Sequence, residues 1–411
     1  MENPPFFDSH VHWRATGEWG RRLDLKLLRS SEDVVLLNPR SENFVGDWLL
    51  GFGWDQNKFK GKAFPEARDL DQKFPRTPVY FLRADGHAAW VNSEALRRSG
   101  LLASAEVSLS QGKILRNSNG TPTGILLELA MGLIEQHIPR ADAFTVEQDL
   151  LAGQEIFLLG GFHHIRDLTC DNLQWEVACH LSERSKIKLY VDQFLSVERI
   201  DDFDERVRFV LSARKQAPPR IQPMGVKVFL DGALGSEGAW LSREYSSGSG
   251  CGLQLISEKD LSSMMKICFE RNVDLAIHVI GDEAAHCATR VAHQLKEQGV
   301  LPTLHYEHAE LLRPETITLM RELRVTCHMQ PSHWLSDKTW LGEKIGPLVQ
   351  HAFRWRALQA AGIPVFFGSD SPIEPSQLAL TEKALKDAAE NHIPAPEGDW
   401  KLFHIHPRRQ Y

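Results

Sequence analysis

The stretch FFDSHVH, residues 6–12, decides how the rest of the chain is interpreted. It is short, it carries the apolar residues Phe6, Phe7 and Val11 of a candidate buried strand, and it ends with the pair His10 and His12. Side chains two residues apart in a strand point to the same side, so both imidazoles can face one interior. The spacing alone is a weak signal, because 18 histidines in 411 residues produce roughly one such pair by chance. The place of this pair at the end of a strand makes it a candidate for metal binding.

Short apolar segments with the same character recur along the chain and alternate with helical runs. Eight candidate strands occupy residues 6–12, 161–168, 187–195, 225–232, 274–282, 303–310, 325–332 and 364–370. Several of the helical runs between them open with residues suited to a helix N-terminus. Eight strands separated by helices predict an α/β fold, a (β/α)8 TIM-like barrel.

The interval between the first two strands is too long for a simple connection. We therefore expect residues 1–39 to hold the first strand and the following helix, residues 40–150 to form an inserted cap, residues 151–390 to complete the barrel, and residues 391–411 to form a tail. The interval has its own strand and helix patterns, so a structureless loop is disfavoured. An insertion after the first strand lies on the face where barrel active sites are found.

Composition narrows the classes of protein. No apolar run reaches the ~20 residues of a membrane helix, and the first residues lack the basic and apolar blocks of a signal peptide. The formal net charge of −7 disfavours nucleic acids and anionic membranes as partners. The six cysteines form no C-x-x-C pair, which favours reduced thiols and a cytoplasmic protein. We expect a small-molecule substrate, and a homo-oligomer is compatible with the sequence.

Polar residues stand near the carboxyl ends of four further candidate strands. They are Lys227, His278, His308 and Asp370, each within an apolar segment. Barrel interiors are normally filled by branched aliphatic side chains, and buried charges are costly unless they are paired or bind a metal. Together with the two histidines near residue 10, these residues predict a metal site at one end of the barrel.

Longer motifs make a resemblance specific. After FFDSHVH the chain carries RADGHAAWVNSEAL (83–96), VKVFLDGALGS (226–236), AIHVIGD (276–282), YEHAELL (306–312), MQPSHWLSD (329–337), RWRAL (354–358) and FGSDSPIE (367–374). In this order the motifs resemble the amidohydrolase superfamily, in particular amidohydrolase family 3, a branch that includes N-substituted formamide deformylase and related N-acyl hydrolases.

The resemblance implies a ligand set and a reaction. His10, His12 and Asp370 would hold one divalent ion, and His278 and His308 a second. Lys227 would be carboxylated by carbon dioxide and bridge the ions; its alternative is a buried lysine paired with Asp231 or Asp370. Two zinc ions per chain are favoured by the mixed imidazole and carboxylate ligands. Metal-activated hydroxide would cleave a C–N bond, with Asp370 as general acid and base.

Other functions remain open from the sequence. The same site could hydrolyse an ester, a lactone or a phosphoester, since fold does not fix the choice. A non-catalytic barrel that binds a ligand is a further alternative, which loss of a metal ligand or of Asp370 would have favoured. All six expected ligands are present.

Softer candidates surround the expected site. Asp85, His87, Gln330, His333 and Arg354 are candidate substrate-binding residues, with packing or cap-stabilising hydrogen bonds as the alternative. Trp54, Trp90, Trp334 and Trp340 could offer apolar faces to a substrate or could simply fill the core. Because the HxH pair begins at residue 10, we also expect the β-sandwich that flanks the barrel in typical relatives to be reduced or absent.

Overall fold

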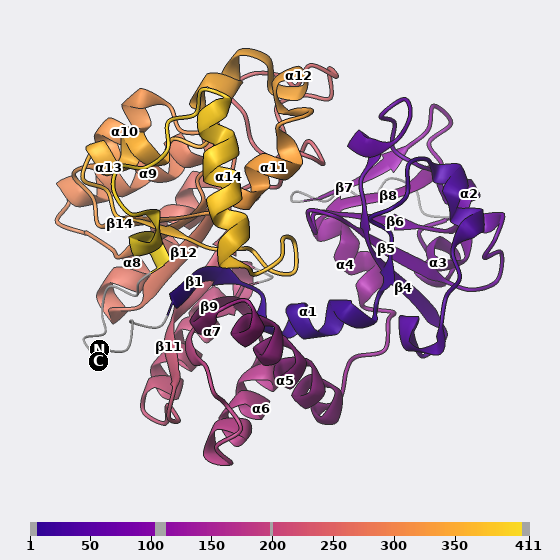
Figure 1. The fold of residues 1–411 in the computed structure, drawn as a ribbon, viewed down its shortest axis with the longest axis horizontal. Coiled ribbons are helices and arrows are strands. Elements are labelled where there is room, and N and C mark those ends of the chain that lie inside the picture. Colours follow the sequence, from indigo (N-terminus) through magenta and orange to yellow (C-terminus); the bar gives the residue numbers. More distant parts are fainter. Residues whose placement is uncertain (1–5, 103–111, 198–199, 405–411) are drawn as a thin grey trace. The chain divides into compact units, whose positions relative to one another are not determined.

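A computed structural model describes residues 6–102, 112–197 and 200–404 of the chain. Eight parallel strands form one sheet, in the order in which they follow along the chain. They are β1 (Phe6–Val11), β9 (Phe162–Cys170), β10 (Tyr190–Ser196), β11 (Ile221–Phe229), β12 (Asp274–Val279), β13 (Leu304–His308), β14 (Val325–Met329) and β15 (Val365–Phe367). Helices lie on the outer side of these strands (Figure 1). The predicted eight-stranded α/β fold is therefore confirmed.

The first and last strands meet and nearly close the sheet into a barrel. Val11 forms a parallel bridge with Ser371, and the amide of His12 donates to the Ser371 carbonyl at 2.9 Å. Gly368 makes this approach possible, because a Cβ at that position would lie 2.5 Å from the backbone nitrogen of His10. The closure therefore brings the loop after β15 alongside the end of β1.

The observed strands differ from the predicted ranges mainly at their carboxyl ends. The fourth strand ends at Phe229 rather than at residue 232, and the fifth at Val279 rather than at 282. The carboxylate of Asp231 accepts hydrogen bonds from the amides of Ile280 and Gly281, at 3.0 and 2.7 Å. These amides are bound by a side chain instead of a neighbouring strand, so the ladder stops before them.

The helices of the barrel unit are α1 (Trp13–Glu18), α5 (Ala143–Leu159), α6 (Asn172–Glu183), α7 (Phe203–Arg214), α8 (Glu258–Arg271), α9 (Asp282–Glu297), α10 (Pro314–Met320), α11 (Pro331–Asp337), α12 (Leu341–Ile345), α13 (Trp355–Ala360) and α14 (Leu378–Glu390). In α9 the residues Ala284, Ala288, Val291 and Leu295 are buried. Their spacing of three and four residues gives the helix one apolar stripe, which is what holds it to the barrel.

The inserted segment forms a compact unit of its own. It comprises Trp19–Ala141 together with Gly232–Gly238. Its sheet has the strand order β2-β4-β5-β6-β8-β7, with β3 paired to β4. The elements are β2 (Leu23–Asp24), β3 (Phe44–Val45), β4 (Trp48–Trp54), β5 (Val79–Arg83), β6 (Ala88–Val91), β7 (Gly112–Arg116), β8 (Pro122–Glu128), α2 (Ala67–Asp71), α3 (Ser93–Arg98) and α4 (Gly132–Glu135). Val79 and Phe81 join one apolar cluster and Tyr80 and Leu82 another, so both faces of the sheet are covered.

The boundaries of this unit lie at residues 19 and 141, whereas the sequence placed them at 40 and 150. The early boundary follows from β2 and β3, which are strands of the inserted sheet. The late boundary follows from α5, which packs on α1 so closely that a Cβ at Gly17 would lie 1.9 Å from the Asp149 carbonyl oxygen. Asp142 caps α5 by accepting from the Thr145 amide at 2.8 Å.

Part of the predicted tail packs on the barrel. The 3-10 helix η8 (Trp400–His404) places the buried ring of His404 beside the first strand, with Nδ1 donating to the Phe7 carbonyl at 3.0 Å. The ring also contacts those of Phe162 and Phe367. Residues 405–411 lie outside the described part of the chain. The residues that the structure describes form the two sheets given above and no third one.

None of the helices within the described ranges is long and apolar enough to cross a membrane.

Burial of His404 makes the barrel sensitive to acid. Burial lowers the pKa of His404 to about 4, whereas an unfolded histidine titrates near 6.5. Between these values only the unfolded chain binds the proton, so stability falls as the pH falls, by about 3 kcal/mol over the whole interval. We expect His404→Gln, which keeps a donor but cannot be charged, to flatten the dependence of the free energy of unfolding on pH between 6.5 and 4.5. His293→Gln, at a more exposed position, is the control; an unchanged slope in His404→Gln contradicts the prediction.

Candidate metal centre

The six expected ligands all stand at the carboxyl ends of barrel strands. They are His10 in β1, His12 directly after it, Lys227 in β11, His278 in β12, His308 at the end of β13 and Asp370 after β15. Because β1 and β15 adjoin and β11, β12 and β13 are consecutive neighbours, the ligands form two groups on opposite arcs of the sheet.

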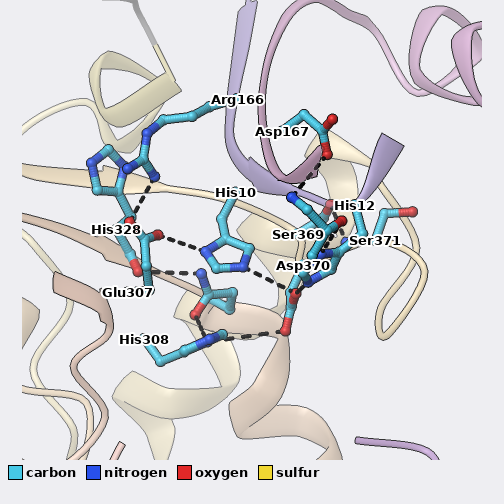
Figure 2. Close-up of polar contacts among 12 residues, drawn as sticks. His10, His12, Arg166, Asp167, Glu307, His308, His328, Ser369, Asp370 and Ser371 are labelled. Atoms are coloured by element: carbon cyan, nitrogen blue, oxygen red, sulfur yellow. Dashed lines mark hydrogen bonds and ion pairs between the residues drawn. The ribbon is translucent and has the colours of Figure 1, made fainter. Parts of the chain in front are cut away.

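The first group is His10, His12 and Asp370. Oδ1 of Asp370 lies 3.3 Å from Nε2 of His10 and 2.9 Å from Nε2 of His12. His10 is fully buried and Asp370 nearly so. Neither His10 Nε2 nor Asp370 Oδ1 makes a hydrogen bond to any described residue, although both atoms are buried. Figure 2 shows the two imidazoles converging on this carboxylate. Buried polar atoms without a partner, facing each other at this range, suit a shared cation.

The second group is Lys227, His278 and His308. The rings of His278 and His308 lie 4.5 Å apart between centroids. The ring of Phe229 contacts both Lys227 and His278. Its centroid lies 4.6 Å from Nζ of Lys227 and 5.3 Å from the centroid of the His278 ring. Lys227 is completely buried, and its Nζ has no hydrogen-bond partner in the described part of the chain. The alternative considered for this lysine, a pairing with Asp231, is not formed at Nζ; Asp231 binds the backbone amides after β12.

His308 joins the two groups. Its ring centroid is 4.7 Å from that of His10, and its Nδ1 is 4.0 Å from Oδ2 of Asp370. His308 and Asp370 both have positive φ, 70° and 60°. Such backbone conformations are uncommon outside glycine and concentrate at functional sites. The structure therefore brings the candidates from β1, β13 and β15 into contact.

Three of the four histidines have their Nδ1 atom bound within the protein. Nδ1 of His10 lies 2.6 Å from Glu307 Oε2, that of His12 3.1 Å from Thr169 Oγ1, and that of His308 2.9 Å from Gln330 Oε1. A ring whose Nδ1 is occupied by a protein partner offers Nε2 to a metal, and the partner also fixes its orientation. The three rings are thus prepared as Nε2 ligands.

Electrostatics fit the same use. Burial lowers the pKa of Lys227 to about 8. Burial raises the pKa of Asp370, but the nearby imidazoles of His10 and His12 lower it more, and the net pKa lies well below its ordinary value. Asp370 is therefore a carboxylate at neutral pH, and a minor fraction of Lys227 is the neutral amine.

His333 and Glu310 lie beside the first group. Nδ1 of His333 is 3.0 Å from Glu310 Oε1, and its Nε2 is 3.5 Å from Asp370 Oδ2. Burial lowers the pKa of His333, but Glu310 raises it more, to about 10. His308, Glu310 and His333 could also hold an ion by their spacing. A protonated imidazole has no lone pair to offer a metal, so His333 is better suited to donate hydrogen bonds.

Several residues of the site were not singled out by the sequence as partners of the ligands: Thr169, Glu307, Glu310 and Arg166. Nη1 of Arg166 forms an ion pair with Glu307 Oε1 at 2.8 Å. The signal for Glu307 was present, since it is a charged residue in an apolar strand directly before His308. Gln330, a candidate for substrate binding from the sequence, accepts from His308 and donates to the His328 carbonyl with its side chain.

The remaining candidates have other surroundings. In the inserted unit, Asp85 is paired with Arg83, and Nδ1 of His87 lies 2.8 Å from Glu128. Arg354 precedes α13, and no hydrogen bond or ion pair joins it to a ligand within the described residues. The four tryptophans are at most 7% exposed, and Trp54 and Trp90 belong to the core of the inserted unit, so they are packing residues and not an aromatic wall.

The amidohydrolase family model matches residues 3–397. The chain belongs to the amidohydrolase family. It is 29% identical over 386 residues to the putative amidohydrolase YtcJ of Bacillus subtilis, covering 90% of this chain and 70% of that protein. It is 22% identical over 408 residues to the N-substituted formamide deformylase of Arthrobacter pascens, covering 94% of this chain and 74% of that protein.

A solved structure agrees with this assignment. An uncharacterized metal-dependent hydrolase from Pyrococcus furiosus superposes with a TM-score of 0.67 at 25% identity, over 93% of this chain and 76% of that one. Membership of the amidohydrolase family identifies the chain as a hydrolase and implies a divalent metal. The residues present fit such an ion, because buried imidazoles with Nδ1 already bound surround a carboxylate oxygen that has no donor.

Proposed function

We propose that the chain hydrolyses an amide-type C–N bond of a small molecule with the help of two divalent ions, zinc being favoured. His10, His12 and Asp370 would hold one ion, His278 and His308 would hold the other, and a carboxylated Lys227 would bridge the two. The observation that carries the proposal is the set of three rings, each with Nδ1 bound to a protein partner, around the Asp370 carboxylate. Such an ion supplies a strong nucleophile at neutral pH, because it lowers the pKa of a bound water, and it polarises a carbonyl oxygen.

Asp370 would move the proton. Its Oδ1 faces His10 and His12, whereas its Oδ2 faces His308 and His333. Oδ2 is therefore the oxygen free to take a proton from the attacking water and to return it to the leaving nitrogen, which must be protonated before the C–N bond breaks. The low pKa of Asp370 supports this role, since the carboxylate is in the basic form at the start of the cycle.

His333 would bind the substrate. Glu310 fixes its ring through Nδ1, and Nε2 is presented beside Oδ2 of Asp370. A donor at this place can orient the carbonyl of an amide while Asp370 exchanges the proton. For Asp85, His87 and Arg354, substrate binding stays a prediction from the sequence.

Asp370→Asn tests the proton transfer. The amide keeps an oxygen for the metal but cannot accept a proton, so we expect metal content to be largely retained and kcat to fall by about 10²–10⁴-fold. Metal is measured by mass spectrometry and turnover with the best amide substrate. Asp399→Asn, at an exposed position, is the matched control. Near-normal kcat in Asp370→Asn would assign the proton transfer to another group.

Lys227 tests the second ion. Only a neutral amine reacts with carbon dioxide, and a pKa of about 8 leaves part of Lys227 neutral at physiological pH. We expect a carbamate signal in ¹³C NMR after loading with labelled bicarbonate and zinc, and two ions per chain. Lys227→Met should lose the signal and one ion, whereas the exposed control Lys383→Met should keep both. Two bound ions in Lys227→Met would refute the bridging role.

The substrate class follows from the family and from the charge of the site. The formamide deformylase of A. pascens acts on N-substituted formamides by its name. Arg83, the arginine that opens the motif at residues 83–96, is already paired with Asp55 and Asp85. A buried arginine between two carboxylates is not available to clamp a phosphate or a carboxylate. These features favour a small, largely uncharged N-acyl or N-formyl amide.

A panel of substrates distinguishes the possible reactions. The zinc-loaded protein is offered neutral N-acyl and N-formyl amines, their ester counterparts, N-acyl amino acids, nucleobases and phosphoesters. We expect the highest kcat/KM with an open-chain neutral amide. A higher value for esters or phosphoesters would keep the metal chemistry and refute the C–N assignment. Preference for a nucleobase or a charged amide would refute the substrate class.

A further inference from the structure

Two buried charged residues lie behind His10, on the side of the ring that faces away from Asp370. Glu307 of β13 is completely buried, and Arg166 of β9 is 2% exposed. Nη1 of Arg166 lies 2.8 Å from Glu307 Oε1, and Glu307 Oε2 lies 2.6 Å from Nδ1 of His10. Figure 2 shows the resulting row, which runs from the guanidinium through the carboxylate and the imidazole to Asp370.

Arg166 is held in place by more than this ion pair. Its Nη1 donates to the carbonyl of Ser9 at 3.3 Å, directly before His10 in β1. Its guanidinium carbon stands 4.1 Å from the centroid of the Phe194 ring in β10. A guanidinium is planar, so stacking on a ring sets the plane in which its N–H groups point. Contacts with three other strands therefore determine where Arg166 holds Glu307.

Burying an ion pair such as Arg166 and Glu307 costs desolvation free energy, so its presence calls for a functional reason. Removing two charges from water carries a penalty that their attraction repays only with excellent geometry, and apolar residues could fill the same space. Barrel interiors are normally filled in that way. A carboxylate on Nδ1 of a histidine ligand fixes the tautomer and the ring orientation and makes Nε2 a better ligand.

We propose that Arg166 is a positioning residue for the metal site. It holds Glu307 so that the carboxylate accepts a hydrogen bond from Nδ1–H of His10, and Nε2 of His10 is then left to face the ion. This inference rests on the proposed function, in which His10 binds a divalent ion. Arg166 acts only through Glu307, and Lys is a poor replacement because a single ammonium cannot reproduce the planar contacts with Glu307, Ser9 and Phe194.

A double-mutant cycle tests this chain of action. The zinc affinity of the metal-free protein is measured by competition with a chelator, for each equivalent bound, in wild type, Glu307→Gln, Arg166→Met and the double variant. We expect each single variant to weaken zinc binding by about 10–100-fold. If Arg166 acts through Glu307, the double variant should bind zinc no more weakly than Glu307→Gln alone. Multiplicative losses in the double variant would overturn the proposal.

A second readout separates positioning from plain stability. The melting temperature is recorded without metal and with saturating zinc, because the increase reports binding to the folded state alone. We expect the zinc-dependent increase to shrink in both variants. Asp274→Asn, which removes a barrel carboxylate 3.2 Å from His305, and Arg214→Met, which removes an arginine bound to backbone carbonyls, are matched controls. These controls should lower the melting temperature with and without zinc alike and leave the zinc-dependent increase unchanged.

The outcomes also distinguish this inference from the proposed function. A wild-type protein that binds no zinc refutes the metal site itself. A wild type that binds zinc, with unchanged affinity in Glu307→Gln and Arg166→Met, refutes the role of the pair and leaves the proposed function standing. Equal losses of affinity in the controls would show a structural effect and overturn the proposal. If Arg166→Met does not fold, Arg166→Lys takes its place, and wild-type affinity in that variant counts against the inference.

Discussion

The contact between β1 and the loop that follows β15 is the constraint on which the metal centre depends. Gly368 admits the backbone of His10, the Val11–Ser371 bridge closes the sheet, and Asp370 is thereby set against His10 and His12. These groups are more than 350 residues apart in the chain. This junction decides whether the three ligand atoms can meet, because packed backbones have little room to adjust.

Closure of the sheet also buries polar groups, and burying them costs free energy. It takes His10, Glu307, Lys227 and Asp370 out of water, where each must be neutralised, hydrogen-bonded or bound to a cation. The structure contains two arrangements of these buried groups. It pairs some groups with each other, as in Arg166 with Glu307, and leaves other atoms, such as His10 Nε2, without any donor or acceptor among the described residues. In the proposed function, unpaired atoms such as His10 Nε2 would bind the metal, whereas the paired groups hold the rings.

The two compact units differ in which candidate residues they contain. All six expected ligands belong to the barrel unit, where they stand at the carboxyl ends of its strands. The inserted unit has a separate core on both faces of its sheet, and its charged residues Arg83, Asp85 and His87 are used within it. The segment Gly232–Gly238, which follows the strand of Lys227, packs with that unit; Gln56 donates to the Gly235 carbonyl at 3.1 Å.

The sequence by itself determined the repeat of apolar strands and helices, the family, and the six candidate ligands. These are local properties: a strand of six residues shows its pattern within itself, and His10, Lys227 or Asp370 stand out because they interrupt such strands. The sequence placed the inserted unit at 40–150, because it could not show that β2 and β3 join one sheet with β4, or that α5 packs on α1. It left open whether Trp54 and Trp90 contact a substrate or fill the core, and the tertiary structure buries both. Only the folded chain decided that Glu307, Thr169 and Gln330 hold the imidazoles and that Arg166 holds Glu307, since hydrogen bonds between distant strands depend on barrel register and leave no periodic trace along the chain.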